Sequence, residues 1–95
     1  MSTLKLRANQ LSNMIGQITT EADTLAQLLK SGITPKAIAD ELEEVLAHSL
    51  ILVSTIADTL IVGNPPAIIE MSQVAKDFLA NLKDINQTIQ ANAIH

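Results

Sequence analysis

The sequence predicts an all-α fold, an up-down-up bundle of three helices over residues 3–30, 35–62 and 65–91. Apolar side chains recur at alternating spacings of three and four residues within each range, which is the period of an amphipathic helix. Gly32 and Gly63 fall between the ranges, where helix ends are expected. The links are short, so that consecutive helices become antiparallel neighbours. At 95 residues, the whole of 1–95 is expected to be a single helical-bundle domain.

The first range has an uninterrupted heptad, which is typical of a helix packed at a shallow angle against others. Its positions are Leu4, Ala8, Leu11, Ile15, Ile18, Ala22, Leu25 and Leu29. The opposite face carries amides and hydroxyls with few charges, and includes Gln10, Asn13 and Gln17. Solvent exposure is the simple interpretation of this face. Because charged residues are depleted from interface cores, it is also a candidate contact surface.

The middle range predicts one long helix, with Thr34 as its N-cap, Pro35 at the first helical position and Gly63 as its C-terminal stop. Two adjacent stripes cover roughly half of its circumference, more than one neighbouring helix needs. One contains Leu42, Val45, Ser49, Leu52, Ile56 and Thr59, and the other Ala39, Leu46, Leu50, Val53, Ala57 and Leu60. This helix is therefore expected to be the central one and to touch at least two others.

Three apolar residues of the middle helix, Ala47, Ile51 and Val62, lie on the side where solvent is expected. A three-helix monomer leaves them exposed, and exposed apolar patches usually indicate association. A membrane span is the competing interpretation of this segment. His48 and Asp58 interrupt it, no basic or aromatic belt flanks it, and a central Asp costs about 2.5 to 3.5 kcal/mol to insert. We therefore expect self-association and no membrane span.

The third range begins after Asn64, which can cap a helix, with Pro65 at the first helical position. Its apolar positions are Ile68, Met71, Ala75, Phe78, Leu82, Ile85 and Ile89. The pairs Lys76-Asp77 and Lys83-Asp84 repeat seven residues apart on the outer face, and indicate one solvated stripe.

Composition excludes several classes of function. Phe78 is the only aromatic residue, so sites that stack bases or sugars on rings are not expected. The chain is acidic, with a net charge of -4 and six Lys and Arg, and shows no basic patch for nucleic acid. It has no cysteine, which excludes disulfides and thiolate chemistry. No signal-peptide pattern opens the sequence, so a cytoplasmic location is expected.

Glu41, Glu44 and His48 are spaced three and four residues apart and share one helix face. Carboxylates in this arrangement can hold Mg²⁺ or Mn²⁺. The simpler interpretation is an acidic first part of the helix that complements its dipole.

The segment from Glu21 to Leu60 resembles the all-α nucleotide pyrophosphatases of the MazG type, which carry Glu-x-x-Glu on one helix and Glu-x-x-Asp on the next. Glu21-Ala-Asp-Thr24 is similar to the first motif and Glu41-Leu-Glu-Glu44 to the second. Thr24 and Glu44 depart from the expected carboxylate and Asp. The resemblance covers less than half of the chain. It implies Mg²⁺-dependent nucleotide hydrolysis with Glu21, Glu41 and Glu44 as metal ligands.

The leading prediction is a non-enzymatic interaction or assembly protein that self-associates or binds a helical protein partner, and that needs no cofactor. Its expected contact residues are Ala47, Ile51 and Val62, with the Gln10, Asn13 and Gln17 face as a second candidate. The alternative is the divergent Mg²⁺-dependent pyrophosphatase, which would also be oligomeric. A monomeric module that binds one partner helix in a groove remains a third hypothesis.

Overall fold

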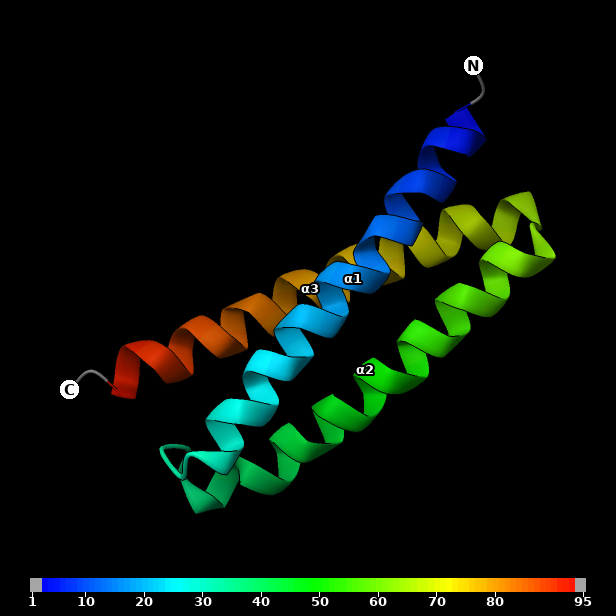
Figure 1. The fold of residues 1–95 in the computed structure, drawn as a ribbon. Coiled ribbons are helices and arrows are strands. Elements are labelled where there is room, and N and C mark those ends of the chain that lie inside the picture. The colour runs from blue at the N-terminus through cyan, green and yellow to red at the C-terminus, as the bar shows by residue number, and fades with distance from the viewer. Residues whose placement is uncertain (1–2, 94–95) are drawn as a thin grey trace.

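The computed structural model describes residues 3–93, which form three α-helices and no strand (Figure 1). Helix α1 spans Thr3–Lys30, α2 spans Lys36–Val62 and α3 spans Pro65–Ala93. The predicted all-α three-helix bundle is therefore confirmed, with bounds close to the predicted ones.

Helix α1 is the hub of the bundle. In Figure 1, α2 runs beside α1, whereas α3 crosses α1 and diverges from α2 after the link between them. Both α2 and α3 share more contacts with α1 than with each other. The expectation that the middle helix is central was therefore wrong, whereas the expectation that it touches two others is confirmed. The apolar arc of α2 is wide enough for two neighbours, but α3 diverges and leaves much of that arc uncovered.

The core is aliphatic and follows the heptad positions of all three helices. Leu11, Ile18 and Leu25 of α1 are completely buried, as a helix between two neighbours requires. The other buried apolar residues are Leu42, Ile56, Ile68, Ala75, Leu79, Leu82 and Ile89. The molecule is elongated, measuring 49 × 20 × 16 Å along its principal axes.

The link between α2 and α3 has the predicted chemistry. Gly63 adopts a left-handed conformation with φ 74°, and its N–H donates to the carbonyl of Thr59 at 3.0 Å. The Oδ1 atom of Asn64 accepts a hydrogen bond from the N–H of Ala67 at 3.3 Å, which caps the first turn of α3.

The start of α2 differs from the prediction. The helix begins at Lys36, and the residue in the cap position is Pro35, which makes no side-chain capping bond. Thr34 was predicted to be the N-cap. Its hydroxyl instead donates a long hydrogen bond of 3.5 Å to the carbonyl of Leu28, which also accepts one of 2.7 Å from the hydroxyl of Ser31.

Candidate interaction surface

Helix α2 is apolar but largely uncovered. An 18-residue window within it has a mean hydropathy of 2.0, and only 11% of that window is buried. By length and composition, α2 is the single candidate for a membrane span within residues 3–93. An equally apolar helix at the centre of a soluble protein would be mostly buried. Leu50, Ile51, Ile61 and Val62 face the surroundings of the molecule, whereas other apolar residues of α2 are partly buried against the core, namely Val45, Leu46, Leu52, Val53 and Leu60.

The most exposed apolar side chains of α2 form one patch, which we call the outer α2 surface. Leu50 is 72% exposed, Ile51 62%, Ile61 82% and Val62 75%. The surface also contains two small exposed residues, Ala47 and Ser54, and one exposed carboxylate, Asp58. The predicted contact residues Ala47, Ile51 and Val62 all lie in it.

Two residues of this surface were missed by the sequence analysis. Leu50 was assigned to a core stripe, which was wrong, because α1 covers only part of the apolar arc of α2. Ile61 was not singled out, although it is the most exposed large apolar side chain on α2. Both residues could have been predicted from a second heptad stripe in the sequence of α2. Its positions are Ala47, Leu50, Ser54, Ala57 and Ile61.

A groove between α1 and α2 adjoins the outer α2 surface at Leu50. It encloses about 340 Å³ and is lined mainly by apolar side chains. The lining comprises Ile18, Thr19, Ala22, Asp23, Ala26, Leu46, Ser49, Leu50 and Val53. Ser49 is almost completely buried, and its hydroxyl donates to the carbonyl of Leu46 at 2.6 Å. The groove therefore extends the apolar surface of α2 toward α1.

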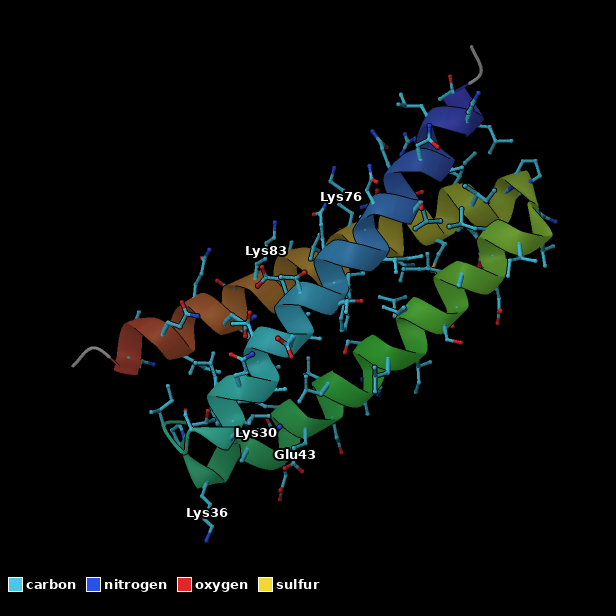
Figure 2. All side chains as sticks on the ribbon, viewed as in Figure 1. Lys30, Lys36, Glu43, Lys76 and Lys83 are labelled. Atoms are coloured by element: carbon cyan, nitrogen blue, oxygen red, sulfur yellow. The ribbon has the colours of Figure 1, made fainter. Side chains whose placement is uncertain are left out.

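The amide-rich face of α1 lies beside α3 and not beside α2. Gln10, Asn13 and Gln17 are exposed, and together they line a shallow polar groove between α1 and α3 that also includes Lys76. Figure 2 shows Lys76 and Lys83 extending from the same side of α3. The structure thus brings these three amides together, but on a surface separate from the outer α2 surface.

Glu21, a metal ligand in the pyrophosphatase alternative, is engaged with α3. Nδ2 of Asn86 donates to the backbone carbonyl of Glu21 at 2.9 Å and to its carboxylate Oε1 at 3.0 Å. Asn86 is only 3% exposed. Within residues 3–93, its Oδ1 atom is buried without a hydrogen-bond partner. These two bonds tie the middle of α1 to the second half of α3.

The other two candidate ligands, Glu41 and Glu44, are exposed on α2, as is His48. In the described part of the chain, no group of three or more His, Asp or Glu side chains is placed to hold a metal ion. Glu21, Glu41 and Glu44 therefore do not form a ligand set within one chain, and the pyrophosphatase hypothesis would need carboxylates from more than one copy.

No protein-family model, curated protein or solved structure matches this chain. Any functional conclusion therefore depends on the surfaces described above.

Proposed function

We propose that this protein is a non-enzymatic helical assembly protein that self-associates through the outer α2 surface. The observation that supports this proposal is the low burial of α2, because only 11% of its most apolar window is fully buried. Exposed apolar surface of this extent in a small soluble bundle is typical of a protein-protein contact.

The size of the surface is sufficient for a specific contact. Leu50, Ile51, Ile61 and Val62 together expose on the order of 500 Å² of apolar area, comparable with the largest patch on a typical monomer. A symmetric pairing covers this patch on both chains, and therefore buries roughly 1,000 Å² before flanking residues are included, which approaches the range of stable interfaces. The Leu50 end adds the α1–α2 groove, into which a side chain of another molecule fits.

The charges and side chains of α2 suit a protein partner better than a lipid surface. Four acidic residues, Asp40, Glu41, Glu43 and Glu44, precede the apolar segment, whereas Lys36 is the only cation of the helix. Anionic lipids repel such a segment. The chain also has no Trp or Tyr to anchor a helix at the membrane interface.

Light scattering after gel filtration, over a hundredfold range of protein concentration, tests the proposal. The protein is expected to form a defined oligomer, and the double variant Leu50→Gln/Ile61→Gln to shift toward monomer while keeping its helicity. Ile69→Gln/Val74→Gln is the matched control, because these two residues of α3 are half-exposed and lie outside the outer α2 surface. A wild-type monomer at every concentration contradicts self-association. Equal oligomerisation of both double variants places the contact elsewhere.

A further inference from the structure

We propose that the outer α2 surface pairs with the same surface of a second copy in antiparallel orientation. The two-fold axis crosses α2 at the level of Thr55 and Ile56. This inference rests on the proposed self-association and specifies its geometry. It is supported by the spacing of side chains on the outer α2 surface and by the distribution of charge along α2.

The spacing matches a helix-helix seam. The stripe Ala47, Leu50, Ser54, Ala57 and Ile61 alternates gaps of three and four residues, as the contact positions of a coiled coil do. Its large members, Leu50 and Ile61, are 72% and 82% exposed, so no part of residues 3–93 occupies the seam there. The small members let the backbone of another helix approach closely.

The charges favour an antiparallel partner. The acidic residues Asp40, Glu41, Glu43 and Glu44 are exposed and occupy one end of α2. A parallel second copy aligns these carboxylates with their own equivalents, and like charges at close range oppose association. An antiparallel copy places the two acidic ends at opposite ends of the pair.

An axis near Thr55 and Ile56 also pairs side chains by size. Leu50 then lies opposite Ile61 of the second copy, and Ser54 opposite Ala57 of the second copy.

Spin labels distinguish the possible orientations. The chain has no cysteine, so Ser54→Cys and Glu43→Cys each introduce one labelling site without other changes. With a helical rise of about 1.5 Å per residue, antiparallel pairing puts two Glu43→Cys labels roughly 40 Å apart, and two Ser54→Cys labels within about 20 Å. Pulsed dipolar spectroscopy measures both distances. A hundredfold excess of unlabelled wild-type chain is the control, and removes any signal that arises between two copies.

A short distance at Ser54→Cys with a long distance at Glu43→Cys supports antiparallel pairing. Short distances at both sites indicate parallel pairing and overturn this inference, but leave the proposed self-association standing. Long distances at both sites in a proven oligomer place the contact outside the outer α2 surface. Coupling that requires phosphatidylcholine vesicles overturns the inference in favour of a lipid-bound state. A monomer by light scattering contradicts the proposed function itself.

Discussion

Asn86 is the residue whose burial has the least obvious benefit for stability. Its two hydrogen bonds to Glu21 each contribute about 0.5 to 1.5 kcal/mol net, whereas a buried oxygen without a partner costs about 1 to 3 kcal/mol. These contributions nearly cancel. Since Nδ2 is satisfied only when Asn86 faces Glu21, we interpret the amide as a device that fixes the register of α1 against α3.

Two substitutions of Asn86 separate register from stability. Asn86→Ala removes both hydrogen bonds and leaves a small cavity, so its free energy of unfolding is expected to fall by about 1 to 2 kcal/mol. Asn86→Leu also removes the whole amide, including the unpartnered Oδ1, but fills its space with apolar atoms, and is expected to stay within about 1 kcal/mol of wild type. Urea denaturation at one fixed protein concentration measures both. If the Leu variant loses as much stability as the Ala variant, the amide contributes net stability and the interpretation fails.

At the scale of the elements, glycine stabilises a left-handed helix end but destabilises a helix interior. Gly63 ends α2 with φ 74°, a conformation that a side chain disfavours whatever the space around it. Gly16 lies inside α1 with helical geometry, and a Cβ atom there would meet nothing within 4 Å. The same substitution is therefore expected to act in opposite directions at the two sites.

Gly63→Ala is expected to lower the free energy of unfolding by about 1 kcal/mol, because Ala resists the left-handed conformation. Gly16→Ala is expected to raise it by roughly 0.5 to 1 kcal/mol, because Ala favours the helix and loses less entropy on folding. Each variant serves as the control for the other in chemical denaturation. A change of the same sign in both variants would show that one of the two local conformations is misassigned.

At the scale of the whole molecule, the proposed self-association would couple folding to association. Binding of a second copy to the folded state alone stabilises that state by mass action. The melting temperature is therefore expected to rise by roughly 5–10 °C over a hundredfold increase in concentration. Circular dichroism at several path lengths measures this shift. Leu50→Gln/Ile61→Gln is expected to melt at the same temperature at every concentration, and a constant wild-type melting temperature would argue against the coupling.

The number of helices and most of their ends were predictable because local chemistry decides them. Gly63 and Asn64 act within a few residues of themselves, and the heptads are properties of single segments. Thr34 was the exception, because its hydroxyl reaches back to a carbonyl at the end of α1.

The identity of the hub was not predictable, because it depends on how the helices are oriented in space. The two apolar stripes of α2 allow contact on either side, and Leu50 is exposed because α1 covers only part of that arc. The exposure of Ala47, Ile51 and Val62 was predictable, since these residues lie opposite both stripes. Nothing local to Asn86 indicates its partner, which is 65 residues away in the sequence.

The position of α1 as hub has a consequence for the order in which the fold is completed during synthesis. Helix α1 precedes α2 and α3 in the chain, so neither of these partners is available when α1 leaves the ribosome. An α1–α2 hairpin can close once α2 has emerged, because its contacts are local. The side of α1 that faces α3 stays exposed to water until α3 has been synthesised. The contact between Asn86 and Glu21 can form only then. Docking of α3 is thus the late step that seals the core.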